Sequence, residues 1–152
     1  MKNLLKVFIQ TEAGSRTKHK YNEKTLEYLG SGEMDEPYPS TYGFVLETTT
    51  DDGDGVDCFL LTQKKLSTSD IVECQAIGLL ELFENGEIDH NDMAVFPEEQ
   101  FKPIDEAVDA IRSFYEDASE LLSKRYPGFE FKVGTFLPVE AAMAFIESSR
   151  DT

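Results

Sequence analysis

Residues 51–61 read DDGDGVDCFLL, an acidic turn that runs directly into an apolar segment. Four carboxylates fall within the first seven of these residues. Like charges this close raise one another's pKa values unless a cation or a hydrogen-bond network compensates. The apolar residues that follow are typical of a strand entering a protein core. The acidic cluster at the head of this strand therefore needs either water or a counter-ion.

Short β-rich segments surround this turn through the first two-thirds of the chain. They are predicted at residues 5–11, 18–22, 42–48, 56–62, 71–83 and 92–96, with turns at residues 13–15, 30–32, 52–53 and 84–86. Apolar residues then recur at helical spacing over residues 104–122, before Pro127 and Gly128. A strand at residues 129–133 and a short helix at residues 138–148 follow. The pattern predicts an α+β, mainly β fold, a small closed five-stranded, OB-like β-barrel flanked by two C-terminal helices.

Length and charge restrict the kinds of protein that this chain can be. A chain of 152 residues is about the size of one domain, so residues 1–152 are predicted to form a single one. A net charge of -16 repels nucleic acid and anionic membranes, so neither is an expected partner. Cys58 and Cys74 are isolated in apolar segments, which is typical of reduced core residues. No membrane span or signal-peptide run is present, so a cytoplasmic location is expected.

A second acidic turn lies about 30 residues after the first, at residues 84–89, which read ENGEID. An EF-hand calcium loop is excluded because its twelfth position would be Leu61, where that loop requires Glu. Two acidic turns that converge at one end of a barrel, without His or Cys between them, would form a hard oxygen site suited to Mg²⁺ or Mn²⁺. His19 and His90 are more typical of surface residues than of ligands. A merely solvated acidic turn remains the alternative.

The acidic segments also carry a resemblance to a known family. The sequence Asp52-Gly53-Asp54-Gly55-Val56-Asp57 resembles the Asp-Gly-Asp-Pro-x-Asp signature of the soluble family I inorganic pyrophosphatases. Residues 37–44, 14–18, 86–89 and 140–142 match further parts of the family pattern, so the resemblance covers nearly all of residues 8–146. It implies that the carboxylates hold divalent cations, which in turn bind pyrophosphate.

The resemblance implies a role for each carboxylate of the two turns. Asp52, Asp57 and Asp89 would bind a pair of metal ions, and Glu84 falls where the family has another metal-binding Asp. Asp54 would orient or deprotonate the water between the two ions. Such a pair of cations lowers the pKa of the attacking water and neutralises the leaving phosphate. The implied reaction is Mg²⁺-dependent hydrolysis of pyrophosphate to two phosphates.

The resemblance assigns the phosphate-binding side to other residues. Lys18 and Tyr42 would contact phosphate oxygens, and Tyr38 would support the pocket wall. For both tyrosines, ordinary packing remains an alternative. Lys20 stands where the family has Glu, and could reach inward to replace a missing cation.

The departures from the family pattern cluster on this same phosphate-binding side. Gln10 stands in place of Glu, Gly30 in place of Arg, Asn91 in place of Lys, and Ala118-Ser119 in place of Tyr-Lys. At least three cationic phosphate ligands are therefore absent from their expected positions. Tyr115, one helical turn from Ala118, could supply a phenol instead.

Three hypotheses follow from the sequence. The first is a Mg²⁺-dependent inorganic pyrophosphatase, weakened or retuned toward another phosphoanhydride. The second is a catalytically lapsed homologue that binds metal or phosphate, and the third is an acidic domain with solvated carboxylates. The resemblance also implies a homo-oligomer, of which the hexamer is the common bacterial form.

Overall fold

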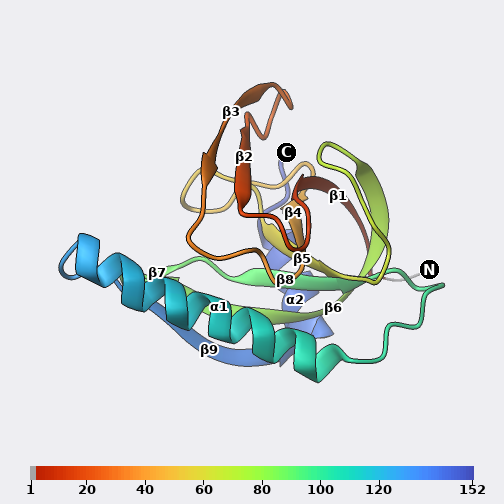
Figure 1. The fold of residues 1–152 in the computed structure, drawn as a ribbon. Helices are drawn as coiled ribbons and strands as arrows, with labels where there is room; N and C mark the ends of the chain where they lie inside the picture. The colour runs from red at the N-terminus through yellow and green to blue at the C-terminus, as the bar shows by residue number, and fades with distance from the viewer. Residues whose placement is uncertain (1–2) are drawn as a thin grey trace.

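The computed structural model describes residues 3–152, and five of its strands close into a ring (Figure 1). The ring consists of β1 (Leu4–Thr11), β4 (Thr41–Val45), β5 (Asp57–Leu61), β8 (Asn91–Val95) and β6 (Ile71–Glu84). β6 pairs back with β1, which leaves no open edge among these five strands. All pairings around the ring are antiparallel except that between β5 and β8. The predicted fold class and the five-stranded closure are confirmed.

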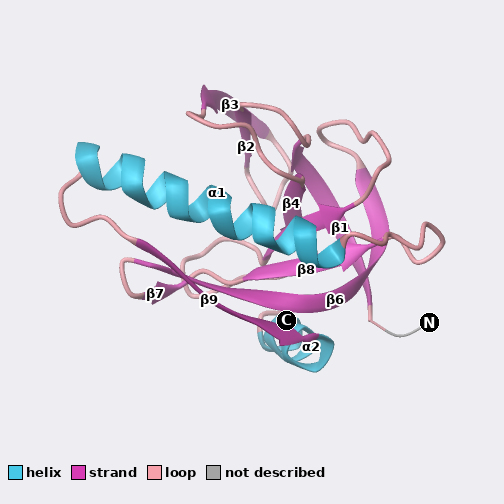
Figure 2. Cartoon of the chain, turned by 60° about the horizontal axis from the view of Figure 1, so that its bottom comes forward, coloured by secondary structure: helices cyan, strands magenta, loops and turns pink. Residues whose placement is uncertain are grey.

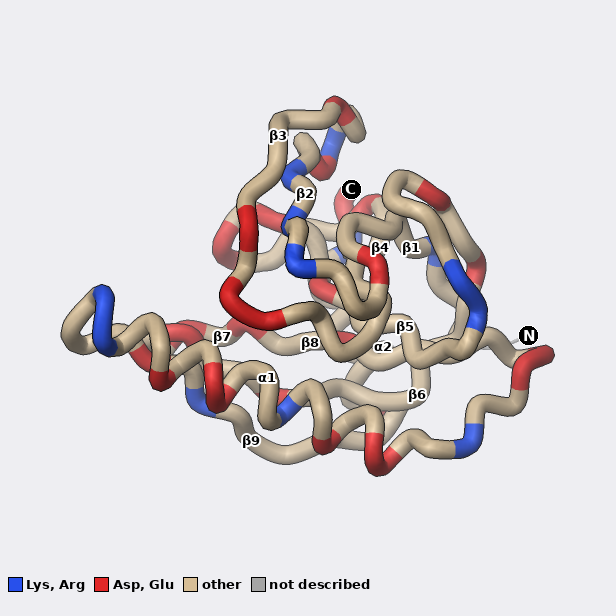
Figure 3. Tube along the Cα trace, in the orientation of Figure 1, with Lys and Arg blue, Asp and Glu red and all other residues tan. Residues whose placement is uncertain are grey.

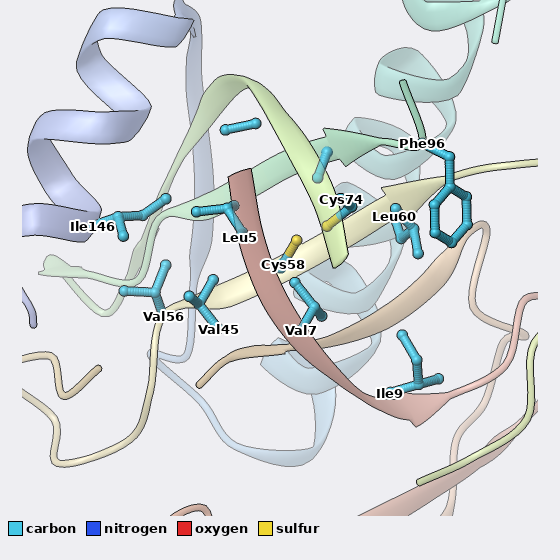
Figure 4. Packing of buried hydrophobic residues seen from close by; sticks show 12 residues of the cluster. Leu5, Val7, Ile9, Val45, Val56, Cys58, Leu60, Cys74, Phe96 and Ile146 are labelled. Atoms are coloured by element: carbon cyan, nitrogen blue, oxygen red, sulfur yellow. The ribbon is translucent and has the colours of Figure 1, made fainter. Parts of the chain in front are cut away.

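The interior of the ring is filled by apolar side chains from all five strands (Figure 4). Leu5, Val7 and Ile9 alternate along β1 and enter this cluster together, because side chains two residues apart share one face of a strand. Cys58 and Cys74 are free and fully buried there, as predicted. They are not isolated from each other, however, because Cys74 lies close enough to raise the pKa of the Cys58 thiol, and both belong to the same buried cluster.

Two helices pack on opposite sides of the long strands (Figure 2). α1 (Ile104–Arg125) covers the outer face of the ring with Val108, Ile111 and Phe114, which lie at the spacing of one helical face. β9 (Phe131–Pro138) pairs with β6, and α2 (Val139–Ser148) packs against β6 from the other side. No helix within residues 3–152 has the length and apolarity needed to cross a membrane.

Two strands, β3 (Tyr28–Glu33) and β7 (Glu87–Ile88), fall outside the predicted strand segments. β3 pairs with β2 (Thr17–Tyr21) in a separate two-stranded sheet, although residues 30–32 were interpreted as a turn. The segment reads YLGSGE and is mostly exposed, so it lacks the apolar alternation of a half-buried strand. Backbone pairing with β2 forms it, and that pairing leaves no local signal in the sequence. The two-residue strand β7 completes the sheet beside β6.

Candidate active site

The two acidic turns meet because β5 and β8 are parallel. Asp57 lies opposite Asn91 in that pairing, so both strands begin at the same edge of the ring. The turn that precedes β5 and the turn that precedes β8 are thereby placed side by side. Together with β2 they surround a cavity of about 390 Å³, the carboxylate pocket. Its walls are Gln10, Lys18, Lys20, Tyr21, Glu23, Leu29, Tyr42, Asp52, Asp54, Asp57, Glu84 and Asp89.

The carboxylate pocket gathers eight of the nine predicted site residues, namely Asp54, Lys18, Lys20, Tyr42, Asp52, Asp57, Asp89 and Glu84. The ninth, Tyr38, is 4% exposed and lines a neighbouring cavity instead. Segments as far apart in the sequence as β2 and the turn before β8 contribute to this one pocket. The fold therefore brings the predicted site residues together around one pocket, except Tyr38, which lines the neighbouring cavity.

The carboxyl groups of Asp57 and Asp89 lie close enough together to shift each other's pKa values. Burial raises the pKa of Asp57 well above its usual range, and the charge of Asp89 raises it further. Burial also raises the pKa of Asp89 to about 6, to which the charges of Glu84 and Asp52 contribute. Two carboxylates this close cannot both ionise cheaply without a counter-charge. The pair is thus suited to hold either a shared proton or a cation.

The loop before β5 is held by its own side chains. Oδ1 of Asp52 accepts hydrogen bonds from the Thr50 hydroxyl at 2.6 Å and from the Asp54 backbone N–H at 2.9 Å. The Gly55 N–H donates to Oε1 of Glu23 at 2.8 Å. Burial raises the pKa of Glu23 to about 7. Sequence reasoning missed Glu23, because it lies in the β2–β3 turn, about 30 residues from the signature, and matches no motif.

The donor set of this pocket fits a hard divalent cation. Six of the lining residues carry carboxyl groups, and none of them is Cys or His. Carboxylate oxygens suit Mg²⁺ and Mn²⁺. Among residues 3–152, no three Asp, Glu, His or Cys side chains converge on a single point that could hold a metal ion. The carboxylates are instead distributed around the pocket, and Asp57 and Asp89 are the pair whose pKa values burial raises.

The basic and aromatic residues have distinct positions. Lys18 lies close enough to Asp54 and Asp89 for its charge to lower the pKa of both, against the larger effect of burial. Lys20 is exposed at the pocket wall. Tyr42 is 8% exposed and its hydroxyl lies close enough to Asp57 to lower the pKa of that carboxyl, against the larger effect of burial, while the ring of Tyr38 packs 5.1 Å from that of Tyr42. Tyr38 is therefore a core residue.

The residues that depart from the family pattern make hydrogen bonds or line a cavity in this structure. Asn91 is fully buried, and its Nδ2 donates to the Tyr115 hydroxyl at 3.2 Å. The Ser119 hydroxyl oxygen accepts the Phe131 N–H at 2.9 Å. Ala118 lines the neighbouring cavity and leaves it open. Tyr115 shares that cavity, as its spacing from Ala118 predicted.

The histidines take no part in the carboxylate pocket. Nδ1 of His90 lies 3.1 Å from the backbone nitrogen of Leu82, and Nδ1 of His19 lies 3.1 Å from the Tyr28 hydroxyl. Both contacts are local, between neighbouring strands. Neither ring lines the pocket.

We expect the stability of the metal-free protein to fall as the pH rises from about 5 to about 8. Glu23, Asp57 and Asp89 have raised pKa values, so the native state binds more protons than the unfolded state in this window. His90 opposes this slope because burial lowers its pKa, but it is one group against three. Glu98 and Asp151 have lowered pKa values and stay largely ionised in both states across this window. Thermal melting in a chelator buffer measures this slope.

Added Mg²⁺ should raise the melting temperature more at the alkaline end of that range, because cation binding requires deprotonated carboxylates. Glu23→Gln removes one titrating group while its amide oxygen can still accept the Gly55 N–H. The variant should therefore show a shallower slope. A melting temperature that is independent of pH and of millimolar Mg²⁺ would contradict the cation site.

A closed ring of five strands with an acidic pocket at one edge defines a small-barrel protein with a site of the divalent-cation type. A family model described as inorganic pyrophosphatase matches residues 7–152. The chain therefore belongs to the inorganic pyrophosphatase family, and the resemblance noted in its sequence is confirmed.

Curated proteins of this family are similar to the chain in sequence. The soluble inorganic pyrophosphatase of Oryza sativa subsp. indica is 33% identical over 122 residues, which cover 75% of this chain and 55% of that protein. The inorganic pyrophosphatase of Mycoplasma genitalium is 31% identical over 90 residues, covering 58% and 49%. The chain thus spans about half the length of these two relatives. The inorganic pyrophosphatase of Nanoarchaeum equitans is 30% identical over 160 residues, covering 95% and 94%.

Solved structures agree on the fold. The inorganic pyrophosphatase of Thermus thermophilus superposes with a TM-score of 0.84 over 97% of this chain and 90% of that one, at 23% identity. The enzyme structure from Coxiella burnetii gives a TM-score of 0.82 at 24% identity, covering 97% and 93%. At this level of identity the likeness establishes the architecture alone.

Proposed function

We propose that this chain hydrolyses inorganic pyrophosphate to two phosphates with the aid of Mg²⁺. The observation that carries the proposal is the carboxylate pocket, where eight predicted site residues from separate strands and turns line one cavity. The family to which the chain belongs supports the same activity. The carboxylates would hold the cations, and the two lysines would face the phosphate oxygens.

In this mechanism Asp52, Asp57, Asp89 and Glu84 would hold Mg²⁺, with Mn²⁺ as a substitute. Bound Mg²⁺ supplies a water of lowered pKa and neutralises charge on the phosphates. Asp54 accepts the proton of the attacking water, a role helped by its pKa, which burial and the charge of Asp52 raise.

The other groups position the reactants around this step. Tyr42 lies beside Asp57 and would position it, while Lys18 and Lys20 would bind phosphate oxygens. A new bond forms between phosphorus and the water oxygen as the bridging P–O bond breaks. The bridging oxygen then leaves with the second phosphate.

A lapsed homologue is the second candidate, and the balance of charge in the pocket favours it. The pocket walls carry six carboxyl groups but only Lys18 and Lys20 as cations. Each absent charge-assisted hydrogen bond to phosphate is worth roughly 1.5–3 kcal/mol. Three of them would correspond to roughly 10³ to 10⁶ in rate if they added and acted only in the transition state. Such a protein would still bind the cation.

Phosphate release from pyrophosphate in the presence of Mg²⁺ separates the two candidates. We expect release that depends on Mg²⁺ and stops when a chelator is added. Cation binding seen by melting temperature, without any phosphate release, would support the lapsed homologue instead.

The oligomeric state and the cellular location of the protein are inferred from the same family. We infer a homo-oligomer in the cytoplasm, with the hexamer as the expected form, from the resemblance to the family. The exposed side chains of Ile71, Ile88 and Tyr126 supply apolar surface for such contacts. Apolar contact is needed because a charge of -16 on each subunit opposes association.

A further inference from the structure

A second cavity adjoins the carboxylate pocket. Its volume is about 380 Å³, and we call it the aromatic pocket. The two cavities share Lys18, Tyr42, Glu84 and Asp89 as common walls. A ligand whose charged end lies over the carboxylates can therefore extend its other end into the aromatic pocket.

The walls of the aromatic pocket are mainly apolar. Phe114, Tyr115 and Leu122 line it from α1, and Phe129 and Phe131 line it from the opposite side. The rings of Phe129 and Phe131 stand edge to face at 4.9 Å and 90°. Beyond the walls shared with the carboxylate pocket, these side chains offer an inorganic phosphate chain few hydrogen bonds in exchange for lost water, because the Tyr115 hydroxyl already contacts Asn91. A flat organic ring does gain from them by burying apolar area and stacking.

The charges at the rim of this pocket also argue against a phosphate group. Glu33, Asp35 and Glu36 gather where β3 ends (Figure 3). The nearby guanidinium group of Arg125 donates to the Asp35 carboxylate at 2.9 Å, so its charge is already paired. An acidic rim repels an anion but accepts hydrogen bonds from amino groups. An uncharged ring that carries amino groups would therefore fit these walls and this rim.

We propose that the aromatic pocket binds the base of a nucleoside diphosphate whose anhydride lies over the carboxylate pocket. This inference rests on the proposed phosphoanhydride hydrolysis. Water attacks the terminal phosphorus, the P–O bond of the anhydride breaks, and the bridging oxygen leaves with the nucleoside monophosphate. The products are one inorganic phosphate and one monophosphate, and no oxidant or reductant is needed.

The test compares three substrates on the full chain with Mg²⁺: ADP, pyrophosphate and linear tripolyphosphate, which has no organic group. Ala118→Tyr fills the aromatic pocket from α1. Ala110→Tyr places the same side chain at an exposed position of that helix as a control. We expect Ala118→Tyr to lower kcat/KM for ADP itself at least about tenfold, and Ala110→Tyr to leave it unchanged. The value for pyrophosphate is compared separately, because Ala118→Tyr also reintroduces the phenol that the family has at this position.

Binding provides a readout that does not depend on turnover. The methylene-bridged ADP analogue, titrated by calorimetry, should bind Ala118→Tyr at least about tenfold more weakly than Ala110→Tyr. Phe129→Ala, which removes one wall of the pocket, should also weaken binding of the analogue. This variant replaces Ala118→Tyr in the test if Ala118→Tyr does not fold.

The outcomes distinguish this inference from the proposed function. Hydrolysis of pyrophosphate with ADP turnover about 100-fold lower would overturn the inference and leave the proposed function intact. Preference for tripolyphosphate over ADP would also overturn it. If no substrate is hydrolysed, the proposed function fails, and binding of the ADP analogue then tests the aromatic pocket. Weaker binding of the analogue to Ala118→Tyr than to Ala110→Tyr supports a base site. Equal binding to the two variants, or no binding at all, overturns it.

Discussion

Asp54→Asn is expected to lower phosphate release from pyrophosphate by about 10³-fold, because the variant cannot accept a proton from the attacking water. The Asp54 side chain lines the carboxylate pocket beside Asp52 and Lys18. The backbone of Asp54 holds the loop, because its N–H donates to Oδ1 of Asp52 and its carbonyl oxygen accepts the Thr50 N–H at 2.7 Å, and both bonds survive the substitution. Asp52, Asp57 and Asp89 remain, so the rise in melting temperature with Mg²⁺ should persist. Catalysis and cation binding should thus separate.

Asp51→Asn is the matched control, since Asp51 is an exposed acid in the same loop that does not line the pocket. It removes the same charge and should leave the rate nearly unchanged. Steady-state phosphate release gives the rate, and thermal melting with and without Mg²⁺ gives cation binding. Equal loss of rate in both variants would show that overall charge, and not the carboxylate of Asp54, supports the reaction.

Gly43→Ala is expected to lower the free energy of unfolding by about 3 kcal/mol or more, at the upper end of the cost of overpacking. Gly43 lies in β4 opposite Ile9 of β1. A Cβ atom added there would lie 1.9 Å from the Phe8 carbonyl oxygen. The obstacle is backbone rather than a movable side chain, so β1 and β4 would have to separate. That separation would open the ring on which the carboxylate pocket is built.

Gly32→Ala is the control for this prediction, because a Cβ at Gly32 meets no atom within 4 Å. It also lies in a strand, β3, but outside the ring. Urea unfolding followed by circular dichroism should place Gly32→Ala close to the parent protein and Gly43→Ala far below it. Equal stability of the two variants would contradict the close approach of β1 and β4.

Much of the fold could be predicted from local patterns. The alternation of Leu5, Val7 and Ile9 marked β1, and the helical spacing of Val108 and Ile111 marked α1. Both acidic turns were predicted to converge, and they line one pocket. These features depend on residue spacing and charge within short stretches of chain, which can be seen in the sequence alone.

Other features of the site depend on contacts between distant segments. β3 forms because β2 supplies its backbone partners, and Glu23 reaches the loop before β5 across 32 positions of sequence. The Cys58 and Cys74 thiols meet because β5 and β6 belong to the same ring. None of these contacts leaves a spacing or a charge cluster for sequence reasoning to detect.

The sequence by itself determined which residues could carry chemistry, and the tertiary structure decided how they meet. The signature names Asp57, but only the parallel pairing of β5 with β8 brings it against Asp89 and makes a buried acid pair. Ala118 appears in the sequence only as a lost tyrosine, whereas the packing of α1 beside β9 makes it the wall of a second cavity. Residue identity is local, but burial and mutual charge arise only when remote strands close into a ring.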